Sequence, residues 1–257
     1  ALSNVCRKVD CIIHLAAVNA RQSQDDPQLA IKVNGIGSYN LIQASVKSNV
    51  KYFIYFSTAH IYGLPLTGKI DESTLPKPAH PYAITHRLAE DFLLESIGSQ
   101  NVKGCIVRLS NSIGPPLTKE TNCWMLFVNN ACKQAIVDRR IVINFNPYSK
   151  RDFVPISSIC KITEYFLSSY MTEDYPIFNV GSGVSHTLLQ IAEIISDRCK
   201  ELLGFSPEII FDESNAIDNT SLEYKINKLT TVMGYTINSS LESSIDEVLE
   251  FCNVEFG

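Results

Sequence analysis

Two stretches decide the fold class: Tyr52-Phe-Ile-Tyr-Phe-Ser57-Thr58 and Tyr82-Ala-Ile-Thr-His86-Arg-Leu-Ala-Glu-Asp91. The first is an apolar run that ends in two hydroxyls, and the carboxyl end of a buried strand is where open α/β sheets bind ligands. The second is typical of a helix, on which residues four apart share a face, so Tyr82 and His86 project together. A phenol, a hydroxyl and a nitrogen base in one pocket are what proton transfer at a sugar or alcohol hydroxyl requires.

Short apolar runs alternate with longer stretches of helical spacing along the chain. We expect strands at 10–16, 51–57, 103–109 and 176–180, and helices at 27–48, 81–98, 123–138, 157–171, 187–204 and 241–252. Short continuous apolar strands separated by helices indicate a parallel sheet with helices on both faces. After residue 181 the pattern predicts a helix, a short strand at Glu208–Phe211, a polar loop and a last helix.

Six further motifs follow one another in a recognisable order. They are Asp10-Cys-Ile-Ile-His-Leu-Ala-Ala17, Asn34-Gly-Ile-Gly-Ser-Tyr-Asn-Leu-Ile42, Arg108-Leu-Ser-Asn-Ser-Ile-Gly-Pro-Pro116, Arg151-Asp-Phe-Val154, Phe178-Asn-Val-Gly-Ser-Gly183, and Asn227-Lys-Leu with Met233-Gly-Tyr235. In this order the chain resembles the extended short-chain dehydrogenase/reductase family, in its nucleotide-sugar epimerase/dehydratase branch. The resemblance implies a Rossmann-like α/β fold with a smaller substrate-binding domain. Residues 1–116 and 151–180 would form the C-terminal part of the dinucleotide-binding domain, and residues 117–150 and 181–257 the substrate-binding domain.

The resemblance also implies a function and a set of site residues. The chain would be an NAD(P)-dependent nucleotide-sugar epimerase or reductase, with NAD or NADP as cofactor and a nucleotide-diphosphate sugar as substrate. Tyr82 would be the acid/base, Thr58 would bind the reacting sugar hydroxyl, and His86 would replace the family's lysine. The residues that would bind the cofactor are Leu15, Ala16, Ala17, Asn34, Ser57, Tyr82 and His86. Those that would bind the substrate are Thr58, Asn111 and Arg151.

Two departures from the family pattern stand beside the match. The family's Tyr-x-x-x-Lys is Tyr82-x-x-x-His86 here, and no Gly-x-x-Gly-x-x-Gly turn for dinucleotide phosphates occurs in the 257 residues. Because two preceding βαβ units would need roughly 60 residues, we expect a fragment whose first strand has an unpaired apolar edge. The dehydratase branch resembles Ser-Thr-Asp-Glu where this chain has Ser57-Thr-Ala-His60, so no acid pair is present to eliminate water. A catalytically degenerate nucleotide-sugar-binding protein of the same fold is the alternative.

The histidine changes the expected chemistry. Lowering a tyrosine pKa from about 10 to near 7 requires about 4 kcal/mol, which one positive charge at about 4 Å supplies at an effective dielectric of 20. A histidine with a pKa near 6.5 is only about one-tenth protonated at pH 7.5. His86 should therefore activate Tyr82 poorly unless a carboxylate raises its pKa or the nicotinamide's own charge suffices. Arg87 cannot easily substitute, because it lies about 140° from Tyr82 around the helix.

Each candidate also has a purely structural interpretation. Ser57 and Thr58 could cap the turn after a strand, Tyr82 could be an ordinary helix aromatic, and His86 could be a buried structural residue. Arg151 is a candidate phosphate anchor because its guanidinium forks onto phosphate oxygens. Five further expectations are structural: an Arg151–Asp152 salt bridge and a turn-forming Asn111 as alternatives to substrate contact, His14 packed at a strand end, His60 at a surface or pocket rim, and Asp71-Glu72 in a solvated turn.

Composition limits the class of protein. The net charge of −5 and the lack of basic runs argue against nucleic acid as a main partner. No apolar stretch approaches 18 residues, so we expect no membrane span. Eight cysteines lack any Cys-x-x-Cys, which favours free thiols, with Cys11, Cys105 and Cys160 buried, in a reducing cytoplasm. A homodimer stays open.

Overall fold

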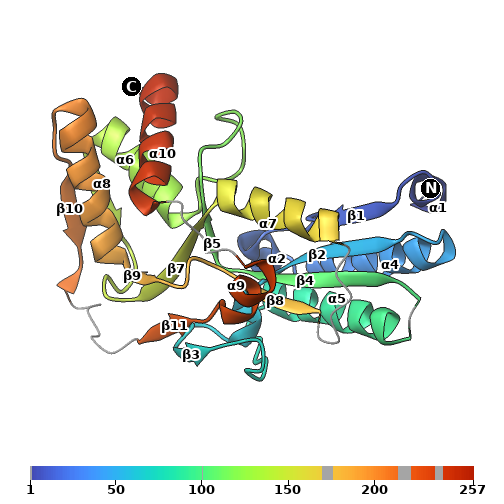
Figure 1. Ribbon diagram of the computed structural model, residues 1–257. Coiled ribbons are helices and arrows are strands. Elements are labelled where there is room, and N and C mark those ends of the chain that lie inside the picture. The colour runs from blue at the N-terminus through green and yellow to red at the C-terminus, as the bar shows by residue number, and fades with distance from the viewer. Residues whose placement is uncertain (1, 100, 170–175, 214–220, 235–239) are drawn as a thin grey trace.

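The computed structural model describes residues 2–99, 101–169, 176–213, 221–234 and 240–257. Its centre is a parallel sheet of four strands in the order β1-β2-β4-β8 (Figure 1). The strands are β1 (Cys11–His14), β2 (Tyr52–Thr58), β4 (Lys103–Leu109) and β8 (Ile177–Val180). The predicted α/β fold with a parallel sheet is confirmed.

The two central strands explain why the apolar runs are continuous. Every residue of β2 is buried, so both faces of the strand need apolar side chains. In the register of β2 with β4, Ser57 lies opposite Arg108 and Thr58 opposite Leu109, so both strands end at the same edge of the sheet. The strands approach closely at Gly104, where a Cβ atom would lie 2.2 Å from the carbonyl oxygen of Phe53. A residue with a side chain at this position would push the strands apart.

Helices cover both faces of this sheet (Figure 1). On one face lie α4 (Ser38–Lys47) and α5 (Pro81–Gly98), which contribute Ile42, Ala89 and Leu93 to the core. On the other lie α7 (Ile156–Ser169) and α9 (Asn227–Met233), which contribute Ile162, Phe166 and Leu229. Burying each of the larger side chains stabilises the fold by about 2 kcal/mol.

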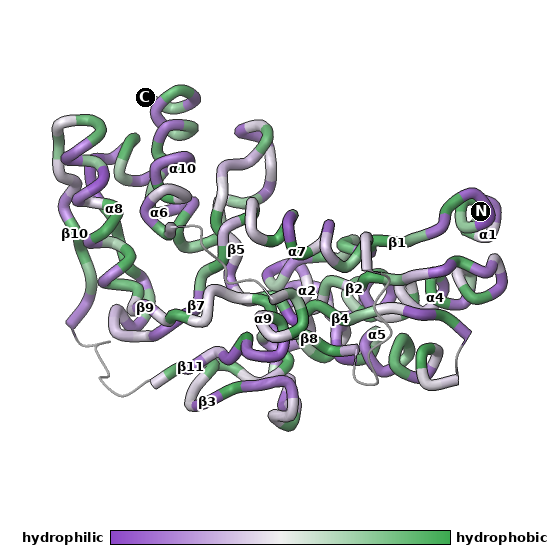
Figure 2. The backbone as a smooth tube through the Cα atoms, viewed as in Figure 1, coloured by the Kyte–Doolittle hydropathy of each residue, from purple (hydrophilic) through white to green (hydrophobic). Residues whose placement is uncertain are grey.

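A second core forms at the opposite end of the molecule from the N-terminus (Figure 1). It unites α6 (Phe127–Asp138), α8 (Leu188–Leu203) and α10 (Leu241–Phe256) with the parallel pair β6 (Arg140–Ile143) and β10 (Glu208–Phe211). Figure 2 shows hydrophilic and hydrophobic residues alternating along α8 and α10, as expected for helices with one buried face. The remaining elements are α1 (Leu2–Cys6), α2 (Ala20–Asp25), α3 (Pro27–Ala30), η1 (Ile31–Gly37), η2 (Ala59–Tyr62), β3 (Gly68–Ile70), β5 (Asn111–Ile113), β7 (Lys150–Pro155), β9 (Ser185–Thr187) and β11 (Leu222–Tyr224).

The predicted elements are all found within the described residues, although the stretch 27–48 is divided into α3, η1 and α4. Residues 170 and 171 of one predicted helix, Tyr235 of the last motif and most of the polar loop after Phe211 lie outside the described residues. The strand β7 pairs with β5 and β9 and not with the four-stranded sheet. The helix α9 packs against that sheet and not against the second core. The division of the chain into two domains stays a prediction.

One cysteine differs from its expected environment. All eight cysteines are free thiols, and Cys105 is buried as expected, whereas Cys11 is half-buried. The prediction of a buried Cys160 is wrong: this thiol is exposed, because it lies on the outer side of α7. No helix within the described ranges is long and apolar enough to cross a membrane.

Candidate active site

The carboxyl end of β2 places two hydroxyls below the surface. Thr58 caps the short helix η2, since its Oγ1 accepts a hydrogen bond from the backbone N–H of His60 at 3.2 Å. The capping role that the sequence left open for Thr58 is therefore present. The Oγ of Ser57 is buried and has no hydrogen-bond partner among the described residues. This hydroxyl is free to bond a group that enters the site.

The first turn of α5 places Tyr82 and His86 beside this strand end. His80 caps the helix, because its Nδ1 accepts a hydrogen bond from the N–H of Tyr82 at 3.2 Å, and Pro81 occupies the first helical position. The rings of Tyr82 and His86 meet edge to face, with centroids 4.4 Å apart. The two side chains share one face of the helix, as their spacing predicted.

His86 is almost completely buried, with 3 % of its surface exposed. Its Nδ1 lies 2.8 Å from the hydroxyl of Tyr55, while its Nε2 is buried without a partner among the described residues. Burial, with smaller contributions from His14 and His60, lowers the pKa of His86 to about 4. Burial also raises the pKa of the Tyr82 phenol. At neutral pH His86 is thus uncharged and supplies no positive charge that would favour a tyrosinate.

Asn34, in the wide helical turn η1, ties the segment after β1 to α5. Its Oδ1 accepts a hydrogen bond from the N–H of Val18 at 2.8 Å, and its Nδ2 donates to Oγ1 of Thr85 at 3.2 Å. The carboxamide is therefore used inside the protein. Between β1 and Val18, residues Leu15, Ala16 and Ala17 are exposed at the carboxyl end of the sheet.

The substrate candidates Asn111 and Arg151 lie on the neighbouring strands β5 and β7. The Nδ2 of Asn111 donates to the carbonyl oxygen of Asp152 at 2.9 Å and so helps to join the strands. The carboxylate of Asp152 accepts hydrogen bonds from Ser110, Ser182 and Gly183.

Arg151 does not form the salt bridge with Asp152 that the sequence left open as an alternative. It forms no ion pair within the described part of the chain, and its guanidinium lies 5.8 Å from the centroid of the Phe145 ring. Burial lowers the pKa of Arg151. Its charge also contributes to the lowered pKa of His60, after the larger effect of burial.

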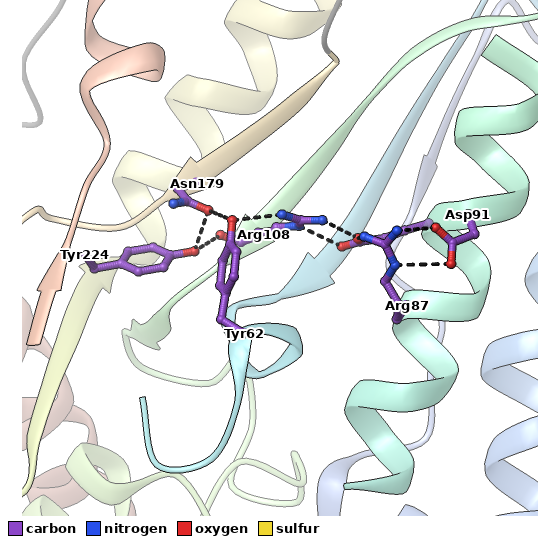
Figure 3. A network of polar contacts seen from close by, with 7 residues as sticks. Tyr62, Arg87, Asp91, Arg108, Asn179 and Tyr224 are labelled. Carbon is purple, nitrogen blue, oxygen red and sulfur yellow. Dashed lines mark hydrogen bonds and ion pairs between the residues drawn. The ribbon is translucent and has the colours of Figure 1, made fainter. Parts of the chain in front are cut away.

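Sequence reasoning missed a buried polar network behind this site, which Figure 3 shows. The guanidinium of Arg108 is held by both carboxylate oxygens of Glu90, at 3.2 and 2.8 Å, and also donates to the hydroxyl of Tyr62 at 2.9 Å. The hydroxyl of Tyr62 in turn donates to Oδ1 of Asn179 at 2.7 Å, and that of Tyr224 donates to the carbonyl oxygen of Arg108 at 2.7 Å, with Oδ1 of Asn179 as a longer second acceptor at 3.1 Å. Arg108 is 1 % and Glu90 0 % exposed, so water stabilises neither charge. The network joins α5, η2 and the strands β4, β8 and β11.

Two neighbouring acidic residues behave differently from the expected solvated turn. Asp71 does form such a turn, with hydrogen bonds from Ser73 and Thr74. The prediction for Glu72 is wrong: its side chain is 8 % exposed, and its carboxylate accepts a hydrogen bond from the backbone N–H of Asn179 at 2.9 Å. Burial raises the pKa of Glu72. Its partner lies more than a hundred residues away in the chain, so the local sequence contains no signal for this contact.

A parallel sheet with helices on both faces, with a phenol, an imidazole and hydroxyls near the carboxyl ends of its strands, defines an α/β protein of the Rossmann class. Residues 1–181 match the model of the family described as NAD dependent epimerase/dehydratase family, and the chain belongs to that family. The resemblance seen in the sequence is confirmed.

Individual relatives agree with this assignment. The UDP-glucose 4-epimerase of Lactobacillus helveticus is 26 % identical over 259 residues, which cover 94 % of this chain and 75 % of that protein. The UDP-glucuronic acid 4-epimerase from Bacillus cereus, solved in complex with NAD, superposes with a TM-score of 0.82 at 21 % identity, over 98 % of this chain and 75 % of that one. RMD from Pseudomonas aeruginosa, complexed with NADPH, gives a TM-score of 0.79 at 21 % identity, over 95 % of this chain and 82 % of that one.

Proposed function

We propose that this chain is an NAD(P)-dependent nucleotide-sugar epimerase or reductase in which Tyr82 exchanges a proton with a sugar hydroxyl. The observation that supports this function is the placement of Tyr82 and His86 on one face of α5, beside the strand end with Thr58. The family to which the chain belongs and the epimerase among its relatives favour the same reaction class. Oxidation or reduction at a sugar hydroxyl carbon requires a group that moves this proton.

The residues present fit the nicotinamide end of a dinucleotide. The exposed segment Leu15–Ala17 offers an apolar surface at the carboxyl end of β1. The partnerless Oγ of Ser57 and Nε2 of His86 supply two buried polar atoms that can bond ribose or amide groups. Asn34 acts indirectly, by fixing the segment after Ala17 against α5. When bound, the nicotinamide accepts or returns a hydride at the sugar carbon.

The chain's own groups then divide the remaining tasks. Thr58 hydrogen-bonds the reacting hydroxyl, and Tyr82 takes up or returns its proton. His86, neutral at pH 7, binds as a hydrogen-bond donor or acceptor and not as a cation. Arg151 supplies a positive charge for the diphosphate of the nucleotide sugar, and Asn111 holds β5 beside it.

The setting of this activity follows from the same proposal. A nucleotide-diphosphate sugar as partner places the chain in carbohydrate biosynthesis. Eight free cysteines suit a reducing compartment such as the cytoplasm. The net charge of −5 without basic runs gives no support for nucleic acid as a partner.

A nucleotide-sugar-binding protein without catalysis is the second candidate. It is favoured by the lowered pKa of His86 and the raised pKa of Tyr82, which together disfavour a tyrosinate. Such a protein would keep the hydroxyls, Asn111 and Arg151 but would not interconvert sugars.

The deciding experiment incubates the chain with UDP-, GDP- and dTDP-hexoses and either NAD or NADP, and separates the sugar products by chromatography. We expect product with at least one pair, and no product with Tyr82→Phe, which keeps the ring and removes the phenol. Tyr39→Phe is the matched control, because Tyr39 lies on the outer side of α4 against Phe92. Product formation by Tyr82→Phe would refute the acid/base role.

The variant His86→Lys separates the two candidates further. If His86 fills the lysine position, the variant should raise turnover and extend activity to higher pH, because an ammonium stabilises the tyrosinate. Sugar binding by calorimetry with no product from wild type, Tyr39→Phe or His86→Lys would favour the binding protein.

A further inference from the structure

The antiparallel strands β7 and β9, which run side by side in Figure 1, place two basic side chains opposite each other. In their register Arg151 is the partner of His186, and Asp152 is the partner of Ser185. Residues directly opposite on antiparallel strands have their side chains on the same face, with Cβ atoms about 5 Å apart. Because successive side chains alternate between faces, Arg151 and His186 share one face of the strand pair, and Asp152 and Ser185 share the other.

The carboxylate on the second face fixes where this strand pair lies. Asp152 accepts hydrogen bonds from Oγ of Ser110 at 2.6 Å, from the N–H and Oγ of Ser182 at 2.9 and 3.0 Å, and from the N–H of Gly183 at 2.8 Å. Ser110 directly follows β4, and Ser182 comes two residues after the end of β8. Arg151 and its partner are thereby held at the carboxyl end of the four-stranded sheet, the edge at which open α/β sheets bind ligands.

Neither basic side chain has a compensating carboxylate within the described part of the chain. Arg151 forms no ion pair there, and the group beside its guanidinium is the apolar ring of Phe145, with the centroid at 5.8 Å. The half-buried imidazole of His186 has no hydrogen bond or ion pair among the same residues. Like charges directly opposite on neighbouring strands are destabilising. The pair therefore favours a neutral imidazole beside the guanidinium until an anion lies between them.

The other charged groups around His186 do not supply that anion. The elements packed against β9 are β7, α8 and β11. Besides Arg151, the charged residues that they contribute near His186 are Lys150, Asp152, Glu193 and Glu223. The first two lie on the face of β7 turned away from His186, the third is exposed, and the fourth forms an ion pair with Lys225. Within the described ranges, Arg151 is thus the charged residue that faces His186.

We propose that Arg151 and His186 together form the binding site for the diphosphate of the nucleotide sugar, in which His186 binds as an imidazolium. A guanidinium and an imidazolium are both pure hydrogen-bond donors, and charge-assisted bonds to phosphate oxygens are strong. A diphosphate has one negative charge for each of the two side chains, so it removes the repulsion between them.

The identity of this ligand rests on the proposed function, whereas the two-residue site rests on the register of β7 and β9. The consequence is a dependence of binding on pH. Imidazole is the side chain that ordinarily gains its charge between pH 8 and pH 5. Binding of the diphosphate therefore takes up a proton from solvent at His186, and acid strengthens binding.

The first test examines the site without a nucleotide sugar. The ring signals of His186 in the full chain, assigned with His186→Gln, are followed by NMR at pH 7 while sulfate replaces chloride at constant ionic strength. Sulfate should move these signals toward the protonated form in wild type but not in Arg151→Ala. Ser185→Ala is the matched control, because Ser185 is the neighbour of His186 on the other face of β9, and it should respond as wild type does. No response in wild type, or an equal one in Arg151→Ala, overturns the site.

The second test measures the affinity for UDP-glucose by calorimetry at pH 6 and pH 8, between which its phosphates keep their charges. Wild type should bind about 5-fold more tightly at pH 6, since one additional charge pair forms at a partly exposed position. His186→Gln should lose this difference, and His186→Arg should bind tightly at both pH values because its charge is permanent.

The outcomes separate the site from the proposed function. Equal wild-type affinities at the two pH values, or a pH dependence retained by His186→Gln, overturn the role of His186. If thermal melting shows that His186→Gln does not fold, the loss of the pH dependence in His186→Arg decides the same question. A response of His186 to sulfate without any binding of UDP-glucose would instead refute the proposed substrate and show that the site takes a different anion.

Discussion

The four-stranded sheet and the core of α6, α8 and α10 bury different kinds of side chain. The helical core contains isoleucines, leucines, alanines and cysteines, and its buried positions are almost entirely apolar. The sheet region also buries Arg108, Glu90, Asn179, His14 and His86. Both regions contain fully buried side chains, but among the described residues the second buries the ion pair of Arg108 and Glu90.

This difference shows where the fold accepts an energetic cost. Burying a charge is unfavourable unless it is paired and hydrogen-bonded. The charged groups gather around the carboxyl ends of β2 and β4, beside the residues assigned to proton transfer, whereas the described helices of the other core bury the uncharged polar residues Asn129 and Ser244. We therefore expect the sheet region to respond to loss of a partner and to pH, and the helical core to respond to volume.

The largest effect should follow from breaking the buried ion pair. Arg108→Met removes the fully buried partner of the Glu90 carboxylate, leaves it only the longer contact to Arg87 at 3.4 Å, and should lower the free energy of unfolding by about 4 kcal/mol. Urea denaturation measures the change. Arg198→Met is the control, because Arg198 pairs with Asp246 at a partly exposed site and should matter much less. The double variant Arg108→Met/Glu90→Leu should recover much of the loss, and a mild single variant would contradict the contrast between the regions.

The next largest effect is acid destabilisation through His86. Its pKa is about 4 in the folded protein and about 6.5 when unfolded. The unfolded state therefore binds the proton first as pH falls. His86 therefore leaves the free energy of unfolding unchanged above pH 6.5 and lowers it progressively, by about 3 kcal/mol in total, as the pH falls toward 4. Burial lowers the pKa values of His14 and His60 as well, so they act in the same direction.

Unfolding free energies from pH 7 to 4 should thus fall less steeply for His86→Gln than for wild type. His186→Gln, at a half-buried position in β9, is the matched control and should follow wild type. Parallel profiles for wild type and His86→Gln would show that His86 does not titrate as a buried group.

A smaller effect concerns ligand binding at the edge of the sheet region. Removing the guanidinium in Arg151→Ala should weaken binding of a nucleotide-diphosphate sugar by about 2 kcal/mol, or about 30-fold in Kd, because a charge-assisted contact is lost. Calorimetry with UDP-glucose measures this. Arg140→Ala, at an exposed position of β6, should bind as wild type does. Equal affinities for both variants would place the diphosphate elsewhere.

The smallest effect tests the helical core. Ile195→Val removes one methylene group from a fully buried position and should cost about 1 kcal/mol of stability, without changing nucleotide-sugar binding. Ile210→Val in β10, where the side chain is 36 % exposed, should cost less. A change in sugar affinity for Ile195→Val would mean that the two regions are more strongly coupled than their separate cores suggest.

Several elements could be predicted because their signals are local. The helix α5 and the strands β4 and β10 have the bounds that the sequence indicated, since an apolar run or a helical period is visible within a few residues. The strands β6 and β7 were missed, and so were the shorter strands β3, β5, β9 and β11. Each of the shorter strands has only three residues, which is too few for a period to appear.

The sequence alone determined the family, the parallel α/β architecture and the shared face of Tyr82 and His86, because periodicity and motif order are properties of neighbouring residues. Only the tertiary structure decided that His86 is neutral, that Tyr55 bonds it from 31 residues away, and that Glu72 is buried. The protonation state of a side chain depends on burial and on hydrogen-bond partners. Both are supplied by segments that are distant in the chain and meet only when it folds.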